Sequence, residues 1–472
     1  MQKTIDIVSF LTEDTQLKFT FKGGVHVNEY KHTAASCVRA VDAPDTVTIP
    51  LSQHIGAHAK PTVEVGARVL VGQVIGEVAE GLGCPVHSSV SGTVKEIKSV
   101  NNAQGIPIQS IVIENDGQGE RSPDVRPNDR APEDCSGEEI AEVVRLAGIS
   151  GMGGATFPTY AKLRGAIGRV AHMIVNCAEC EPFITANHRL MLERPDELLL
   201  GVRVLMCALG LDEATVAVED NKMDAVEKLN ETIRTRGEEL LCGKRVTVAV
   251  MKTKYPQGDE RQLIYALIKK EIPAGKLPAD VGCIIFNAET CAAVKRAFFD
   301  GMPLVSRIVT VDGDCIAQPS NLLAPVGMSY ADLAAACGGF TKMPVKVING
   351  GPMMGAAQWD LEGSVTKGTS AVLFLSEEFV RPTLHHSACI HCGRCVDHCP
   401  MHLMPYELTD LARKKQFDEA MKKDILSCVE CGTCSYGCPA GVEIVQYIRA
   451  AKGAIRQKMA ADRAKDAKGG AK

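Results

Sequence analysis

The chain has 472 residues, 45% hydrophobic and 23% charged, which predicts a globular protein of about three domains and excludes a disordered or fibrous one. Its net charge is only −5, and aromatic residues make up 4%, which argues against a base-stacking surface, so no nucleic-acid partner is expected. The cysteines number 19, the polar start MQKTIDIVSFLTED does not resemble a secretory leader, and no apolar run reaches about 18 residues, so a reducing compartment is expected.

The first third of the chain is predicted to be mostly β. Residues 1–22 form a short lead-in, and residues 23–114 consist of short Val/Ile-rich runs separated by Gly and Pro. Their order resembles the barrel-sandwich fold of biotinyl and lipoyl domains. Those domains carry a modifiable Lys on a hairpin, whereas the hairpin here reads EGLGCPVH, so a biotin or lipoyl carrier is disfavoured. Residues 115–135 are polar and rich in Pro and Gly, which indicates a linker.

The middle of the chain has the pattern of an α/β domain. Ser136 and Glu139 have the spacing of a capping box at a helix N-terminus. Over residues 136–300, apolar strand-like runs alternate with helical segments, which indicates a Rossmann-like layer fold with a mostly parallel sheet. Residues 301–380 return to short strands and are expected to form a β-grasp module and a connection. The fold class predicted for the whole chain is therefore multidomain α/β.

Two cysteine motifs dominate residues 381–449, which are predicted to be a helical ferredoxin-like domain. Each motif reads C-x2-C-x2-C-x3-C-P, the spacing of bacterial two-cluster ferredoxins, in which the fourth Cys of one motif binds the other motif's cluster. We therefore expect two 4Fe-4S clusters. Cluster one is assigned to Cys389, Cys392, Cys395 and Cys438, and cluster two to Cys428, Cys431, Cys434 and Cys399.

Other interpretations of the cysteines, and the predicted C-terminal tail, have less support from the residues. A pair of zinc sites would leave the fourth Cys of each motif poorly explained. Cys177 and Cys180 form a C-x-x-C pair, which alone is weak support for a redox dithiol. Residues 450–472 are rich in Ala and Lys and are expected to be a basic, solvated helix, with contact to an anionic surface as the minor alternative.

A glycine-rich loop precedes the first strand of the α/β domain. The stretch GISGMGGATFPTYAK does not follow a strand and lacks the last Gly of a dinucleotide fingerprint. Its Gly151, Gly153 and Gly154 nevertheless allow backbone N–H groups to converge before a helix that carries Lys162. Backbone donors at a helix N-terminus and a nearby ammonium suit a phosphate, although a simple tight turn is the alternative.

Polar residues follow three predicted strands, where ligands of open α/β sheets bind. Their side chains could accept hydrogen bonds from ribityl or ribose hydroxyls, although each motif alone is more often a solvated strand end. The motifs are NCAECEP with Asn176, Glu179 and Glu181, YPQGDE with Tyr255, Gly258, Asp259 and Glu260, and FNAET with Asn287, Glu289 and Thr290.

The order GMGGATFPTYAK, NCAECEP, YPQGDE, FNAET resembles the FMN- and NADH-binding subunit of respiratory complex I. Two positions depart from that family's pattern, since Met152 replaces the Arg of the loop and Ala178 replaces the first acidic residue of NADE. The resemblance implies FMN contacts from Gly151, Gly153, Gly154, Lys162, Asn176 and Asn287, a flavin and nicotinamide pocket shaped by Glu179, Glu181, Asp259 and Glu260, and a nicotinamide-adenine site bordered by Phe157.

The whole chain resembles a second family more closely. FKGGVH, a Lys-free barrel-sandwich, the flavin loop, VDGDCIAQPSNLLAPVG and two ferredoxin motifs follow one another as in the RnfC family of Rnf electron-transport complexes, over about residues 20–445. VDGDC with NLLAPVG resembles their soluble-ligand-binding β-grasp (SLBB-like) module. The resemblance implies a ferredoxin:NAD oxidoreductase subunit of an ion-translocating complex, docked peripherally on the cytoplasmic face of the membrane. Its partners would be the other subunits and a ferredoxin or iron–sulfur subunit.

The expected chemistry is electron transfer without a general base. NADH delivers two electrons as a hydride, whereas each cluster accepts one, and FMN can convert between the two. Acidic residues near the ribose would repel a 2′-phosphate, which favours NADH over NADPH. Two alternatives stay open: a soluble flavin and iron–sulfur reductase of the same superfamily, such as a cobalamin reductase or the electron carrier of proline reductase, and a pure electron carrier without flavin.

Overall fold

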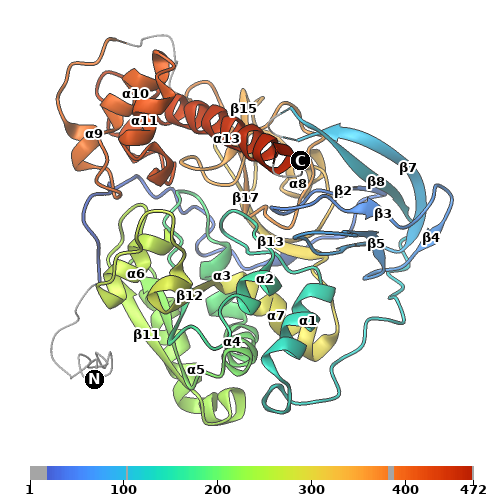
Figure 1. Cartoon of the computed structure of the whole chain (residues 1–472). Coiled ribbons are helices and arrows are strands. Elements are labelled where there is room, and N and C mark those ends of the chain that lie inside the picture. Colours follow the sequence, from blue (N-terminus) through green and yellow to red (C-terminus); the bar gives the residue numbers. More distant parts are fainter. Residues whose placement is uncertain (1–18, 103–104, 381–386, 470–472) are drawn as a thin grey trace.

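The computed structural model describes residues 19–102, 105–380 and 387–469, with side chains as far as residue 462. The predicted lead-in thus lies largely outside the described residues, as do residues 381–386 and the last three residues of the predicted tail. The chain folds into two β-rich parts, an α/β domain and a helical domain, which pack around one another (Figure 1). No helix of the described ranges is long and apolar enough to cross a bilayer.

The barrel-sandwich part consists of two small sheets that share one core. Alternating Val and Ile side chains, among them Val47, Ile49, Ile111 and Ile113, point into that core. The two sheets have the strand orders β2-β8-β7-β4 and β3-β5-β6. The strands are β2 (Thr46–Pro50), β3 (Lys60–Pro61), β4 (Arg68–Val69), β5 (Val74–Glu77), β6 (Val86–His87), β7 (Gly92–Asn101) and β8 (Pro107–Asn115).

The hairpin EGLGCPVH is not a free tip, because it is packed against two other parts of the chain. Cys84, Val86 and His87 are buried. The Lys367 ammonium donates to the Pro85 and Gly148 carbonyls, each at 2.7 Å, so it joins this hairpin to the start of the glycine-rich loop. The barrel-sandwich part therefore supports the loop rather than presenting a mobile arm.

The α/β domain is built on a four-stranded parallel sheet of order β11-β10-β9-β12. Its strands are β9 (His172–Asn176), β10 (Glu213–Glu219), β11 (Arg245–Met251) and β12 (Cys283–Asn287). Its helices are α1 (Gly137–Leu146), α2 (Thr159–Arg164), α3 (Ala186–Glu193), α4 (Pro195–Leu209), α5 (Met223–Leu241), α6 (Glu260–Ile268) and α7 (Ala288–Asp300), with 3-10 turns η2 (Pro132–Asp134) and η3 (Pro278–Val281).

Both faces of the parallel sheet are covered, as its almost continuous Val/Ile strands predict. Val175, Val216 and Phe286 pack on the face that carries α1, α4 and α7, whereas Ile174 and Ile285 pack on the face that carries α6. The capping box predicted at Ser136 is confirmed, since the Ser136 hydroxyl accepts from the Glu139 N–H and the Glu139 carboxylate accepts from the Ser136 N–H.

The second β-rich part is a mixed sheet of order β1-β14-β13-β17-β15-β16 with helix α8 (Tyr330–Ala336). Its strands are β1 (Arg39–Ala40), β13 (Ser306–Asp312), β14 (Ser320–Pro325), β15 (Lys346–Asn349), β16 (Ala356–Ala357) and β17 (Ala371–Leu375). Strand β1 lies within the range assigned to the barrel-sandwich, yet it pairs in parallel with β14. The segment before β2 therefore crosses the molecule (Figure 1).

The helical domain holds both cysteine motifs. Its elements are α9 (Arg394–Asp397), α10 (Pro405–Arg413), α11 (Phe417–Lys422), η4 (Ile425–Ser427), α12 (Thr433–Tyr436) and α13 (Ile444–Gly469). The short helices α9 and α12 each follow a left-handed glycine, Gly393 at φ 78° and Gly432 at φ 81°, so the two motifs turn alike. The predicted basic tail is not a separate element, because α13 begins before it and runs through its described part.

Candidate functional site

The glycine-rich loop lies over the crevice where a ligand of a doubly wound sheet is expected. The chain adds β10 and β11 on one side of β9 and then returns to place β12 on the other side, so the strand order reverses between β9 and β12. Ligands of such sheets bind at that switch point, beyond the carboxyl ends of the strands. Asn176 ends β9 and Asn287 ends β12. A Cβ on Gly153 would lie 2.8 Å from Asn287 Nδ2, so the loop rests directly on this edge.

The loop has a fixed base and an open tip. At the base, Gly151 N–H donates to the Phe157 carbonyl at 2.8 Å, and Met152 N–H donates to Thr290 Oγ1 at 3.0 Å. At the tip, no atom lies within 4 Å of the position that a Cβ on Gly154 would occupy. The N–H groups of Gly151 and Met152 are therefore committed within the protein. Phe157 keeps 38% of its surface exposed beside the open tip.

Lys162 faces the same edge from α2. Its Nζ lies 3.6 Å from Glu260 Oε2 at the start of α6 and 5.9 Å from the centre of the Phe286 ring. Desolvation lowers the pKa of Lys162, and the Glu260 carboxylate opposes that shift. An anion placed at the loop would add a second counter-charge and would favour the ammonium form.

The strand-end asparagines and Asp259 shape the edge by local hydrogen bonds. Asn176 Nδ2 donates to the Gly258 carbonyl at 2.8 Å, which fixes the YPQGDE loop beside β9. Asp259 caps α6 by accepting from the Arg261 and Gln262 N–H groups, and Asn287 caps α7 by accepting from the N–H of the second residue of that helix. Burial raises the pKa of Asp259 to about 6.

Three predicted pocket acids have their carboxylates engaged elsewhere. Glu179 accepts from the N–H groups at the start of α3, at 2.8 and 3.3 Å. Glu181 accepts from the Met353 and Met354 N–H groups at 3.0 and 2.8 Å. Glu289 is buried and pairs with Arg307 at 2.6 Å. In this structure the three side chains join parts of the protein to one another, so their roles as cofactor contacts are not supported by their geometry.

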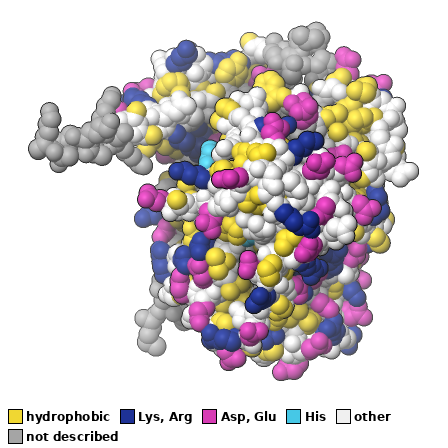
Figure 2. Space-filling view, turned by 90° about the vertical axis from the view of Figure 1, so that its right-hand side faces the viewer, with side chains coloured by type: hydrophobic (Ala, Val, Ile, Leu, Met, Phe, Trp, Pro, Cys, Tyr) yellow, Lys and Arg dark blue, Asp and Glu magenta, His cyan; other side chains and the backbone are white. Residues whose placement is uncertain are grey.

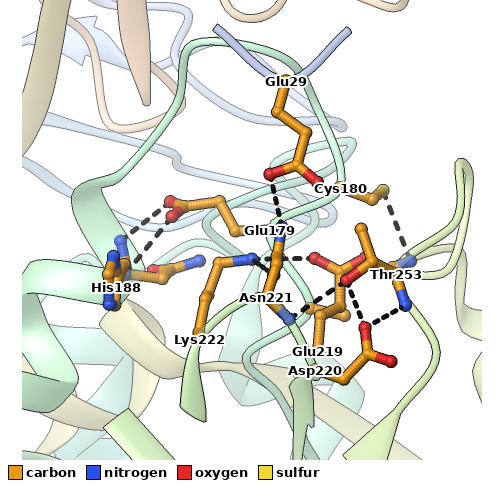
Figure 3. A network of polar contacts seen from close by, with 12 residues as sticks. Glu29, Glu179, Cys180, His188, Glu219, Asp220, Asn221, Lys222 and Thr253 are labelled. Atoms are coloured by element: carbon orange, nitrogen blue, oxygen red, sulfur yellow. Dashed lines mark hydrogen bonds and ion pairs between the residues drawn. The ribbon is translucent and has the colours of Figure 1, made fainter. Parts of the chain in front are cut away.

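Two lysines beside NCAECEP, the partly buried Lys31 and the buried Lys222, were not anticipated from the sequence. Lys31 donates to the carbonyls of Glu179, Glu181 and Ile184 at 2.6–2.8 Å, and burial lowers the pKa of Lys31 to about 8. Figure 3 shows the neighbouring pair of Lys222 and Glu219, 2.9 Å apart, at the carboxyl end of β10. A Lys within a polar run gives no sign of such burial, because its partners are backbone atoms far along the chain.

Cys177 and Cys180 follow β9, so they lie just beyond the carboxyl end of that strand. Both are free, and burial raises the pKa of each thiol. Cys180 Sγ accepts from Gly258 N–H at 3.4 Å, a contact drawn in Figure 3. Since the thiolate is the reactive form of Cys, this environment disfavours a redox dithiol here.

The structure brings the cluster-two cysteines together from both motifs. Cys399 of the first motif and Cys428, Cys431 and Cys434 of the second line one cavity, whose wall also includes Leu408, Val445 and Ile448. Leu403 N–H and Glu430 N–H point to the sulfurs of Cys399 and Cys428, each at 3.4 Å. Four Cys thiolates are the ligand set of a 4Fe-4S cluster, so the donor set of this cavity fits the group. Within the described ranges, no three His, Cys, Asp or Glu side chains form a site for a single metal ion.

The cluster-one cysteines are on the whole more exposed than those of cluster two. Burial raises the pKa of the Cys395 thiol, and the charges of Cys389 and Cys438 act in the same direction. Cys389 and Cys392 are exposed, whereas three of the four cluster-two cysteines are buried. The hydroxyl of Tyr255, predicted as a cofactor contact, donates instead to the carbonyl of Cys431 at 2.7 Å.

Comparisons with known proteins divide the chain into the same four parts. Residues 19–118 match the RnfC barrel sandwich hybrid domain, and residues 144–296 match the Nuo51 FMN-binding domain. Residues 308–357 match the SLBB domain, and residues 388–442 match the 4Fe-4S dicluster domain. The predicted fold class is thereby confirmed.

Several relatives are similar over nearly the whole chain. The C subunit of the proton-translocating ferredoxin:NAD(+) oxidoreductase complex of Clostridium ljungdahlii is 41% identical, over 91% of this chain and 93% of the relative. Its counterpart in the Na(+)-translocating ferredoxin:NAD(+) oxidoreductase complex of Acetobacterium woodii is 40% identical, over 92% and 96%. The counterpart in the ion-translocating oxidoreductase complex of Rhodobacter capsulatus is 37% identical, over 93% and 84%.

Proposed function

Because the chain belongs to the RnfC family of ion-translocating ferredoxin:NAD(+) oxidoreductase complexes, we propose that it passes electrons between NADH, FMN and two 4Fe-4S clusters in such a complex. NADH and two oxidised clusters give NAD+, one proton and two singly reduced clusters. When bound, FMN would supply the conversion between a two-electron hydride donor and one-electron acceptors. The protein binds and orients these groups and requires no general base.

FMN belongs at the switch point of the parallel sheet. Gly153, Gly154 and Lys162 would hold its phosphate, and Asn176 and Asn287 would border its ring at the strand ends. Buried polar atoms near this edge support the assignment, since Ser150 Oγ, Thr159 Oγ1 and both amide atoms of Gln257 are buried without a partner in the protein. Buried polar groups are normally satisfied, so these atoms fit a bound polar cofactor.

One observation carries the proposal, namely that a flavin-type crevice and a four-cysteine cavity occur in one chain and are joined by direct contacts. The cavity of cluster two lies next to the YPQGDE loop, because Tyr255 of that loop donates to the Cys431 carbonyl. Cluster one would lie farther from that loop, since its proposed ligands Cys389 and Cys392 are exposed. Cluster two would therefore be the one nearer to FMN, and cluster one would exchange electrons with the partner.

The exposed part of the helical domain around Cys389 and Cys392 is the proposed contact with the electron partner. Ile390 lies between the exposed ligands of cluster one and keeps 62% of its surface exposed. A ferredoxin or an iron–sulfur subunit of the complex would place its own centre there. On the face drawn in Figure 2, acidic, basic and apolar side chains are intermixed. The chain is proposed to dock peripherally on the cytoplasmic face of the membrane, on the other subunits.

The test is anaerobic purification followed by counts of iron, acid-labile sulfide and flavin and by titration with NADH. We expect one flavin and two clusters' worth of iron per chain, and NADH should bleach the flavin and cluster bands. A protein with the clusters but with neither flavin nor NADH response would be a pure electron carrier, and a protein that contains zinc in place of iron would refute the proposal. Reduction of cobalamin at a comparable rate would favour the soluble reductase.

A further inference from the structure

Tyr255 lies between the carboxyl edge of the parallel sheet, where FMN is proposed, and the cavity lined by the cluster-two cysteines. Its side chain is 1% exposed, and its hydroxyl donates to the carbonyl oxygen of the cluster-two ligand Cys431 at 2.7 Å. The Tyr255 N–H donates to the Val25 carbonyl at 2.9 Å, and the Tyr255 carbonyl accepts from the Val25 N–H at 2.8 Å. The ring therefore cannot move without breaking contacts to two other segments.

The other ligand segment of cluster two is tied to the same place. Gly24 N–H donates to the His398 carbonyl at 2.9 Å, and a Cβ on Gly23 would lie 2.8 Å from the Cys399 carbonyl oxygen. From α6, Gln262 Nε2 donates to the Pro400 carbonyl at 3.3 Å. The segment around Cys399 and the segment around Cys431 are thus each in contact with the α/β domain or with the stretch from Gly23 to Val25, which pairs with Tyr255.

A third contact comes from the loop between β15 and β16. Glu181 accepts from the Met353 N–H, and the Met353 carbonyl oxygen would lie 3.1 Å from a Cβ on Gly432, between the ligands Cys431 and Cys434. Met353 and Cys180 pack in one apolar group with Tyr255 and Cys431. The segment that carries Cys431 is therefore held against the loop that carries Tyr255 by apolar contacts as well as by a hydrogen bond.

We propose that Tyr255 is a positioning residue for the step between flavin and cluster two, which it serves by holding the Cys431 loop against the edge of the parallel sheet. This inference rests on the proposed function. In that step one electron leaves the reduced flavin and enters the oxidised cluster, and Tyr255 itself gains and loses neither an electron nor a proton. Hydride transfer from NADH precedes the step and does not depend on the hydroxyl.

The test compares Tyr255→Phe with Tyr330→Phe. Tyr330 is the matched control, because it is 2% exposed and its hydroxyl accepts from Asn349 Nδ2 at 2.8 Å in the SLBB part. The complete, cluster-loaded chain is mixed with NADH anaerobically in a stopped-flow instrument, and the flavin and cluster bands are followed separately. A redox titration monitored by electron paramagnetic resonance gives the potential of each cluster, and iron and flavin are counted for each variant.

We expect Tyr255→Phe to reduce its flavin as fast as wild type and to reduce cluster two about five- to a hundredfold more slowly, since a lost hydrogen bond and a small misplacement have effects of this size. Its signal or potential for cluster two should change while that of cluster one does not. Tyr330→Phe should match wild type. Wild-type behaviour of Tyr255→Phe in every readout would overturn the inference.

Other outcomes are also decisive. If NADH fails to bleach the flavin in wild type, the proposed function fails and the inference with it. If Tyr255→Phe lacks cluster iron, the same measurements are made on Gln262→Leu. This variant removes the hydrogen bond to the Pro400 carbonyl and leaves Tyr255 in place. If Gln262→Leu reduces cluster two more slowly but reduces its flavin at the wild-type rate, the result supports positioning of the cluster-two ligands by these contacts. Unchanged kinetics would refute it.

Discussion

The pairing of Glu289 with Arg307 gives a direct test of whether Glu289 serves the fold or the cofactor. Glu289 Oε2 lies 2.6 Å from Arg307 Nη2, its Oε1 accepts from the Ile308 N–H at 2.7 Å, and the two side chains are 2% and 1% exposed. Glu289→Gln leaves the Arg307 guanidinium buried without its counter-charge. Breaking a buried pair in this way costs about 3–5 kcal/mol.

A domain of about 150–250 residues loses about 2–4 °C in melting temperature for each kcal/mol of stability lost. The melting temperature of Glu289→Gln should therefore be lower than that of wild type by about 6–20 °C. Calorimetry or circular dichroism under anaerobic conditions measures the shift. The control is Glu260→Gln, whose side chain is 43% exposed and 3.6 Å from Lys162, so its pair contributes at most about 1 kcal/mol. Flavin content is measured well below both transitions. A Glu289→Gln protein that melts like wild type but loses its flavin would refute the structural role and favour a cofactor contact.

Three further predictions concern other parts of the site. Lys162→Ala should weaken FMN binding about ten- to a hundredfold, since a charge-assisted hydrogen bond is lost, and should leave the cluster absorbance intact; unchanged flavin content would remove Lys162 from the phosphate site. Cys438→Ala should remove the signal and iron of cluster one alone, and loss of cluster two instead would exclude the crossed ligation. Burial raises the pKa of Glu181 from 4.5 to about 7, so the folded state holds an extra proton between these values. The free energy of unfolding should therefore fall by about 3 kcal/mol as pH rises through that window, and denaturant titrations should show this slope in wild type but not in Glu181→Gln.

Local patterns predicted the domain types well. The capping box at Ser136 depends on residues only three apart in the sequence. The parallel sheet followed from apolar runs that alternate with helices, because each βαβ unit is written in one continuous stretch. Such features need few contacts from elsewhere in the chain.

The same patterns did not predict the surroundings of side chains whose hydrogen-bond partners lie elsewhere in the sequence. Glu179, Glu181 and Glu289 follow strands and so were expected in the pocket, but backbone N–H groups and Arg307 supply their partners. Lys31 reached its three carbonyls across about 150 positions of sequence. Neither residue type nor spacing distinguishes a carboxylate that faces a ligand from one that caps a helix.

The amino-acid sequence by itself determined which chemistry the chain can hold, since eight cysteines at ferredoxin spacing and a glycine-rich loop before a helix are local facts of order and residue type. Only the tertiary structure decided how these parts are connected, with Cys399 meeting the second motif and Tyr255 meeting Cys431. The physical reason is that an electron relay depends on distances between groups far apart in the chain, and those distances are set when the apolar faces of separate domains pack together.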